Sequence, residues 1–157
     1  MNPAPFCLIG IVNVTPDSFS DGGKYIDPCN AVAHGLRLLD EGAGMLDLGA
    51  ESTRPFAEPV PEGEEIARLM PVVARLREQR PDAVLSVDTL KAGTARAALE
   101  GGADIINDVS ACVADPALLD VLAEYKPGYV LMHSQGSPRE MQVNPRYGNV
   151  VEEILAF

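Results

Sequence analysis

One stretch decides the fold of this chain: Ile11-Val12-Asn13-Val14-Thr15-Pro16-Asp17-Ser18-Phe19-Ser20-Asp21-Gly22-Gly23. It begins as an apolar run that ends at Asn13 and continues as a loop rich in hydroxyls, carboxylates and glycine. Further along the chain, apolar runs end in polar clusters at 47–54, Asp88, Asn107-Asp108 and His133. Parallel strands end this way when their carboxyl ends carry a ligand site. The sequence therefore predicts a site assembled from several strand ends.

Five short apolar runs predict strands, with helical patterns between them. The expected strands are Cys7 to Val14, Met45 to Leu48, Val84 to Asp88, Ile105 to Val109 and Tyr129 to Met132. Apolar helical faces are formed by Val32, Leu36 and Leu39, by Ile66, Leu69, Val73 and Leu76, and by a last pattern that begins at Val150. Nearly continuous apolar strands that alternate with helices indicate an α/β fold with a parallel sheet.

Several local signals mark where the helices begin and end. Pro71 should kink or restart its helix, because proline has no N–H for the helical hydrogen bond. Asp115-Pro116 predicts an N-cap followed by proline at the first helical position. The junctions 41–44 and 100–103 are glycine-rich and each precedes a strand, so they predict a left-handed residue after the helix and a weak βα repeat.

Two architectures fit this alternation, an open doubly wound sheet and a (β/α)8 TIM barrel. An open sheet concentrates its site at one switch point, whereas here every strand end carries a polar group, which favours the barrel. A complete barrel needs roughly 200 residues or more. We therefore expect residues 1–157 to form the N-terminal part of a single barrel domain, with about five of the eight βα units of this fold.

Composition narrows the classes of partner. The net charge is −11 and there is no run of Lys or Arg, which argues against nucleic acid and anionic membrane surfaces. No apolar run approaches the roughly 18 residues of a spanning helix, and the first residues carry no basic signal-peptide segment. Three widely spaced cysteines, Cys7, Cys29 and Cys112, predict buried, reduced thiols and a cytoplasmic location rather than a disulfide framework or a zinc site.

The chain resembles dihydropteroate synthase, the sulfonamide-sensitive enzyme of folate synthesis. The segments that carry the resemblance are 10–23, Gly49-Ala50-Glu51-Ser52-Thr53-Arg54-Pro55, Ser86-Val87-Asp88-Thr89, Ile105-Ile106-Asn107-Asp108-Val109 and 131–138, followed by Met141-Gln142. The first two are long and specific, and the order and spacing of all five make chance agreement implausible. The sequence departs from the family at Ala50 and Phe56, where the family usually has glycine.

The resemblance implies a pterin-binding barrel and small-molecule substrates, dihydropterin pyrophosphate and 4-aminobenzoate. It assigns catalytic roles to Asn13, Arg54 and Asp88, with Asn13 also contacting Mg²⁺, the implied cofactor. Substrate binding is assigned to Asp88 and Asn107 for the pterin, to Arg54 for pyrophosphate, and to Phe19, Thr53 and Pro55 for aminobenzoate. It also implies a homodimer for the full-length enzyme and mobile first and second loops that order with the ligands.

The chemistry of these side chains suits such roles. An Asn oxygen can bind a hard cation, and the Arg guanidinium binds phosphate through two charge-assisted hydrogen bonds. A carboxylate accepts from the adjacent N–H groups of a pterin edge, and an amide supplies both a donor and an acceptor. The structural alternatives are that Asn13, Asp88 and Asn107 cap helices or turns, and that Arg54 pairs with a nearby glutamate at the surface.

The remaining polar residues have more ordinary interpretations. We expect Asp47 to be a buried, hydrogen-bonded carboxylate that supports the layer below the site, and Asp108 to be structural because strand alternation turns it away from Asn107. Lys91 is interpreted as a surface residue at a helix start, which leaves Arg54 as the main cation at any strand end. His133 could line the pterin site, and His34 should pack on a helix or lie at the surface.

Two alternatives to an active synthase stay open. Another pterin-binding barrel, such as a methyltetrahydrofolate methyltransferase domain, would share the pterin-edge Asp and Asn but would not be expected to have the first two loops. A non-catalytic truncated fragment is favoured by the absence of the Asp, Lys and Arg-His pair that later strands of the family supply. The 157-residue chain alone is then expected to be inactive, with the inward faces of Ile11, Leu46 and Val87 lacking partners.

Overall fold

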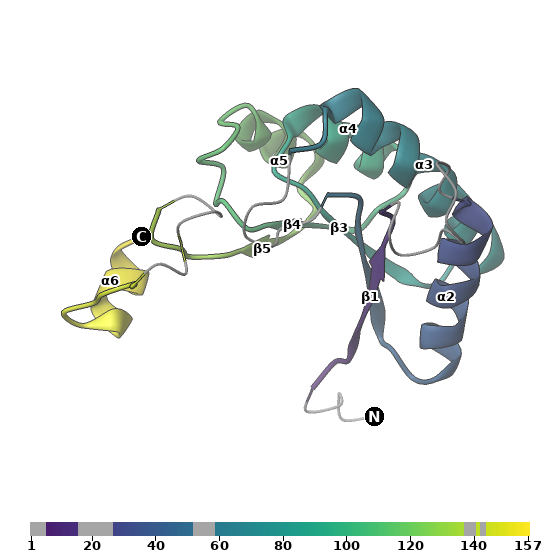
Figure 1. Cartoon of the computed structure of the whole chain (residues 1–157), viewed down its shortest axis with the longest axis horizontal. Coiled ribbons are helices and arrows are strands. Elements are labelled where there is room, and N and C mark those ends of the chain that lie inside the picture. The colour runs from purple at the N-terminus through teal and green to yellow at the C-terminus, as the bar shows by residue number, and fades with distance from the viewer. Residues whose placement is uncertain (1–5, 16–26, 52–58, 137–140, 142–143) are drawn as a thin grey trace.

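The computed structural model describes residues 6–15, 27–51, 59–136, 141 and 144–157. Strands and helices alternate along the chain (Figure 1). The elements are β1 (Ile9–Asn13), α2 (Pro28–Asp40), β2 (Met45–Gly49), α3 (Glu62–Gln79), β3 (Val84–Asp88), α4 (Ala92–Glu100), β4 (Ile105–Asp108), α5 (Leu118–Tyr125), β5 (Gly128–Leu131) and α6 (Val150–Ala156). All five predicted strands are present within one or two residues of their expected bounds.

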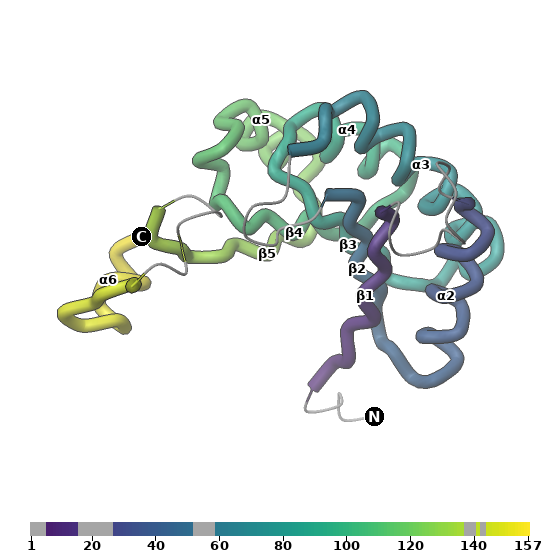
Figure 2. The backbone as a smooth tube through the Cα atoms, in the orientation of Figure 1, coloured from purple at the N-terminus to yellow at the C-terminus, as the bar shows by residue number. Residues whose placement is uncertain are grey.

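The sheet has the strand order of a barrel. Its five strands are parallel and follow one another in sequence order, β1-β2-β3-β4-β5. In a doubly wound sheet the order of the strands reverses at a switch point, and helices cover both faces of the sheet. Here α2, α3, α4 and α5 cover the same face of a curved sheet, as the ribbon and the backbone tube both show (Figures 1 and 2). The prediction of a (β/α)8-type arrangement is confirmed.

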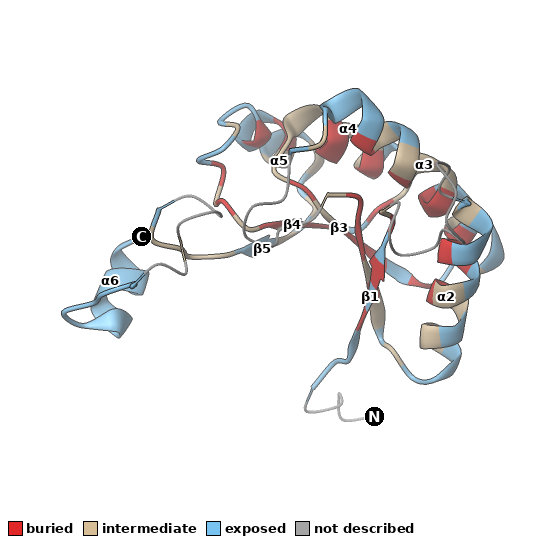
Figure 3. Ribbon diagram, viewed as in Figure 1, coloured by how far each residue is buried: buried red, intermediate tan, exposed pale blue. Residues whose placement is uncertain are grey.

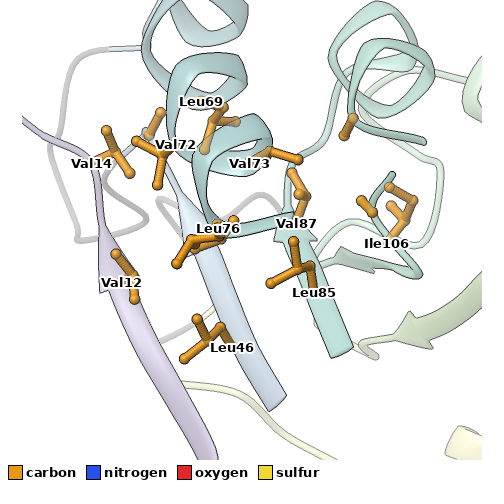
Figure 4. Packing of buried hydrophobic residues seen from close by; sticks show 14 of the residues in the cluster. Val12, Val14, Leu46, Leu69, Val72, Val73, Leu76, Leu85, Val87 and Ile106 are labelled. Atoms are coloured by element: carbon orange, nitrogen blue, oxygen red, sulfur yellow. The ribbon is translucent and has the colours of Figure 1, made fainter. Parts of the chain in front are cut away.

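The hydrophobic core lies between the sheet and these helices. Alternate strand residues point toward the helices and pack against the apolar faces of α2 and α3 (Figure 4). Leu46, Val87, Leu69 and Leu76 are fully buried there. The expectation that Leu46 and Val87 point into the barrel is therefore wrong: in a strand, successive side chains alternate between faces, and these two share the face of Val12.

The opposite face of the sheet, which we call the inner face, is open. Figure 3 shows exposed and half-buried residues alternating with buried ones along the strands. Ile11 is 62% exposed, and Ile9, Val84 and Val130 are also exposed on this face. The prediction that inward apolar residues lack partners is confirmed for Ile11.

The helix boundaries follow the predicted local signals in part. Gly42 and Gly102 have φ values of +107° and +98°, so each supplies the left-handed residue expected after its helix. Pro71 does not restart its helix, because α3 runs from Glu62 to Gln79 and is held by buried residues on both sides of the proline. Asp115 caps a turn by accepting from the Ala117 N–H, so α5 begins two residues later than the Asp-Pro signal predicts.

The cysteines and the helix lengths bear on two further predictions. All three cysteines are free, as expected, but only Cys112 is buried; the expectation of burial is wrong for Cys7 and Cys29, which are exposed. Cys7 precedes β1, and Cys29 lies in the first turn of α2, where the helix faces outward. In the described ranges, no helix is long and apolar enough to cross a membrane.

Candidate active site

The carboxyl ends of four strands place one row of residues across the inner face. The strand register aligns Asn13 of β1 with Gly49 of β2, Gly49 with Asp88 of β3, and Asp88 with Asn107 of β4. Three of the side chains that the sequence predicts for the site are thus brought together. Because Gly49 has no side chain, it leaves a gap between Asn13 and Asp88; a Cβ there would lie 3.7 Å from Asp88 Oδ2.

A second row supports the first from below. Asp47 lies one strand step deeper, and its Oδ1 accepts from Ser86 Oγ at 2.6 Å while its Oδ2 accepts from Asn107 Nδ2 at 3.0 Å. Both oxygens of this carboxylate therefore accept a hydrogen bond, one from a side chain of β3 and one from a side chain of β4. The contact fixes the orientation of the Asn107 carboxamide, so the prediction that Asp47 is a hydrogen-bonded support is confirmed, although the residue is half-buried rather than buried.

Asp88 is the electrostatic centre of the row. Burial, followed by repulsion from Asp47, Glu65, Asp108 and Glu51, raises the pKa of Asp88 to about 7. In the described part of the chain no donor hydrogen-bonds its carboxylate, which sets it apart from its neighbours. A carboxylate that is this costly to ionise, and that no described residue hydrogen-bonds, favours a ligand with adjacent N–H donors.

Asp108 points to the other side of the sheet, as strand alternation predicts, and has a structural role. Its carboxylate is fully buried and accepts from the N–H groups of Ser110 and Cys112, from Ser110 Oγ and from the Tyr129 hydroxyl. Burial alone raises its pKa, but these four donors outweigh it and hold the pKa of Asp108 below its usual value. The same bonds hold Ala111 and Cys112 at positive φ, which is unfavourable for residues with a side chain.

Replacing Asp108 by asparagine should destabilise the protein by about 2–3 kcal/mol near neutral pH, because the buried donors lose a charged acceptor. A depressed pKa contributes stability above the unfolded-state value that is lost as the pH falls through the folded-state value. The free energy of unfolding in urea should therefore differ most between wild type and Asp108→Asn above pH ~5, and less toward pH ~3. A difference that does not depend on pH would contradict this assignment.

Lys91 is not the surface residue that the sequence suggested. Its ammonium forms ion pairs with Glu51, at the end of β2, and with Glu65 Oε2 on α3 at 2.6 Å. Burial alone lowers its pKa, but the hydrogen bonds to these carboxylates outweigh it and raise the pKa of Lys91 above its usual value. Lys91 is therefore a cation near the strand ends that was not predicted from the sequence to belong to the site.

The sequence contains one signal for the cluster formed by Lys91, Glu51 and Glu65. Glu65 stands in the apolar stripe of α3, four residues before Leu69 and eleven before Leu76, and it is 1% exposed. A glutamate in such a stripe needs a buried partner, because an isolated carboxylate is costly to desolvate. That partner, Lys91, is the N-cap residue of α4, and its position depends on how α3 and α4 pack and cannot be inferred from the sequence spacing.

Other predicted residues lie outside this row or outside the described residues. Phe19, Thr53, Arg54 and Pro55 belong to the second group, as does Phe56. His133 follows β5, and its ring lies 4.7 Å from that of Phe157 and 5.7 Å from that of Tyr147. His34 is half-buried on α2, and its Nδ1 lies 2.9 Å from Arg37 Nη2 on the same helix, in line with the expected position on a helix or at the surface.

Known proteins resemble this chain in both sequence and structure. A family model described as pterin binding enzyme matches residues 9–157. Dihydropteroate synthase of Mycobacterium leprae is 46% identical over 157 residues, which are 99% of this chain and 55% of the relative. The enzyme of Haemophilus influenzae is 45% identical over 150 residues, 96% of this chain and 54% of the relative. The chain thus spans about half the length of the curated relatives it matches.

Solved structures of dihydropteroate synthases are similar to this chain in fold as well as in sequence. Xanthomonas albilineans dihydropteroate synthase with 4-aminobenzoic acid has a TM-score of 0.82 and 49% identity, covering 96% of this chain and 52% of that one. The Yersinia pestis enzyme in a sulfonamide drug complex has a TM-score of 0.85 and 44% identity, covering 96% of this chain and 54% of that one. The resemblance seen in the sequence is confirmed.

Proposed function

Because this chain belongs to the pterin binding enzyme family, we propose that the activity of the whole protein is that of a dihydropteroate synthase. The amine of 4-aminobenzoate attacks the methylene carbon of 6-hydroxymethyl-7,8-dihydropterin pyrophosphate. A C–N bond forms, the C–O bond to pyrophosphate breaks, and the amine loses a proton to give 7,8-dihydropteroate. The observation that carries the proposal is the Asp88 carboxylate, which lies beside Asn107 at the carboxyl end of the sheet and accepts no hydrogen bond from any described residue.

The two residues divide the work of holding the pterin. Asp88 accepts hydrogen bonds from the ring N–H and amino groups of the pterin edge, and this contact brings its pKa back toward the usual range. Asn107, oriented by Asp47, contributes the acceptor and donor of its carboxamide. A pterin fixed in this way keeps its methylene in line with the attacking amine, and the ring can share positive charge that develops on that carbon.

Asn13 fits a role at the pyrophosphate. Its side chain is exposed at the end of β1, across the gap left by Gly49 from Asp88. Among the described residues, no group of three or more His, Cys, Asp or Glu side chains could hold a metal ion. Asn13 instead fits a Mg²⁺ ion that is bound by the substrate pyrophosphate, because Mg²⁺ usually has only one or two protein ligands and is otherwise bound by substrate oxygens and waters. Bound there, Mg²⁺ would stabilise negative charge on the leaving pyrophosphate.

The other substrate contacts rest on the resemblance. Arg54 is proposed to bind pyrophosphate, with Phe19, Thr53 and Pro55 forming the aminobenzoate pocket. The homodimer implied by the resemblance and the cytoplasmic location predicted from the cysteine pattern stay predictions.

The proposed activity is tested by incubating the full-length native protein with both substrates and Mg²⁺. Formation of 7,8-dihydropteroate with equimolar pyrophosphate is the expected result. Absence of both products, or methyl transfer from methyltetrahydrofolate instead, would overturn the proposal and favour the methyltransferase alternative.

Substituting Arg54 by alanine should raise the KM for aminobenzoate and weaken pyrophosphate binding, each by roughly tenfold to a hundredfold, because a charge-assisted hydrogen-bond donor is lost. Sulfonamide binding, measured by calorimetry in the presence of pterin and pyrophosphate, should fall in parallel. Arg80→Ala is the matched control, since Arg80 pairs only with exposed Asp40 and Asp82 in the described part of the chain. Unchanged sulfonamide binding in Arg54→Ala would contradict the assignment.

A further inference from the structure

We propose that Lys91 is a positioning residue that fixes the carboxyl end of β2, and through it the approach of aminobenzoate. The inference rests on the proposed function and assigns a role to three residues outside the pterin row. It begins from the ion pairs of Lys91 with Glu51 and Glu65, which join β2, α3 and α4 at one point.

The cluster is built as a buried anchor. Glu65 is 1% exposed and cannot turn to solvent, and its Oε2 accepts from both Lys91 Nζ at 2.6 Å and Thr94 Oγ1 at 3.2 Å. The α3–α4 contact is tightened further by Glu62, whose Oε1 accepts from the Gly93 N–H at 2.8 Å. The ion pair with buried Glu65 therefore fixes the position of the Lys91 ammonium, which also pairs with Glu51.

The end of β2 is held at two adjacent residues. Lys91 pairs with the side chain of Glu51, and Arg68 Nη1 donates to the backbone carbonyl of Ala50 at 3.0 Å. Thr53 and Arg54 follow Glu51 by only two and three residues in the sequence. The direction in which the chain leaves β2 is thus set by α3 and α4, which lie on the far side of the sheet from the substrates.

The pterin row shares no hydrogen bond with this anchor among the described residues, and the link between them is the repulsion by which Glu51 and Glu65 contribute to the raised pKa of Asp88. Asn107 is oriented by Asp47, and no side chain of the cluster hydrogen-bonds Asp88 in the described ranges. Loss of the anchor should therefore affect the substrate bound by residues after β2 more than the substrate bound by Asp88 and Asn107. This separation distinguishes positioning from a general loss of structure.

Glu51→Gln in the full-length native protein is the sharpest test, because Lys91 keeps its pair with buried Glu65 and the fold is retained. The KM for 4-aminobenzoate should rise about tenfold or more, while the KM for dihydropterin pyrophosphate stays within about twofold and the thermal midpoint within about 3 °C of the parent. Equal rises in both KM values, or an unchanged aminobenzoate KM, would overturn the proposal.

A second variant and a control distinguish loss of positioning from loss of the fold. Lys91→Ala alone removes the charged partner of buried Glu65, which keeps only its hydrogen bond from Thr94, and should destabilise the fold. Lys91→Met is therefore combined with Glu65→Gln, and this pair should reproduce the aminobenzoate defect. Arg96→Met is the control: Arg96 lies on the same helix and pairs with exposed Glu124, and its loss should change neither KM.

Hydrogen exchange gives a readout that does not need the proposed activity. Amides 49–51 should exchange faster in Glu51→Gln and in the double variant than in the parent or in Arg96→Met. If these amides exchange faster in the variants but the parent protein makes no dihydropteroate, the anchoring role of Lys91 is supported and the proposed function is rejected. Unchanged exchange would reject the anchor itself.

Discussion

Substituting Asp88 by alanine in the full-length native protein should remove most of its pterin affinity. The loss of a buried acceptor for charge-assisted hydrogen bonds costs about 2–5 kcal/mol, or roughly thirtyfold to several thousandfold in Kd. The effect is expected to be large because Asp88 lies between Asn13 and Asn107 in the row and is the carboxylate there that no described residue hydrogen-bonds. Calorimetry with 6-hydroxymethyl-7,8-dihydropterin pyrophosphate measures it directly.

Two further variants make this result interpretable. Asp88→Asn keeps the shape of the side chain but replaces one acceptor by a donor, so it should lose affinity as well while keeping the fold. Asp120→Ala removes an exposed carboxylate on α5 and should bind pterin like the parent. Parental affinity in Asp88→Ala would show that the pterin lies elsewhere.

Residues 1–157 purified by themselves are expected to release no pyrophosphate and to self-associate. Within the described sheet, β1 pairs only with β2 and β5 only with β4, so each leaves an edge of free backbone groups. Next to these edges, Ile9, Ile11 and Val130 are exposed on the inner face. Open edges beside apolar side chains pair with other chains, whereas a closed barrel has no edge.

A sizing column and a pyrophosphate-release assay test this expectation. Replacing Ile9 and Ile11 by lysine places charge beside the β1 edge and should reduce association without restoring turnover. Exposed Val113→Lys, in the β4–α5 connection, is the control and should associate like the parent. A monomer of 1–157 that turns over at a normal rate would contradict both parts of the prediction.

Much of the fold could be predicted because its signals are local. A continuous apolar run such as Val84 to Asp88 gives its own strand, and Gly42 and Gly102 mark left-handed turns that disfavour a side chain. The errors arose where packing outweighs a local signal. Pro71 sits within one helix because the residues around it are buried, and Leu46 and Val87 face the helices rather than the barrel interior.

The candidate site was predicted unevenly for the same reason. Asn13, Asp88 and Asn107 each end a strand, so a parallel sheet brings them into one row without further information. Lys91 was misjudged because its partners, Glu51 and Glu65, lie 40 and 26 residues away in the sequence. Nothing in the local pattern of a helix start indicates such distant carboxylates.

The sequence by itself therefore determined the alternation of strands and helices, the polar ends of the strands and the family, because each depends on neighbouring residues or on the order and spacing of motifs along one chain. Only the tertiary structure decided the electrostatic environment of the ionisable residues at and near the site. The raised pKa of Asp88, the lowered pKa of Asp108 and the burial of Glu65 beside Lys91 come from groups that meet only when the sheet and helices pack. Burial and Coulomb interactions depend on distance in space, which a linear sequence does not record.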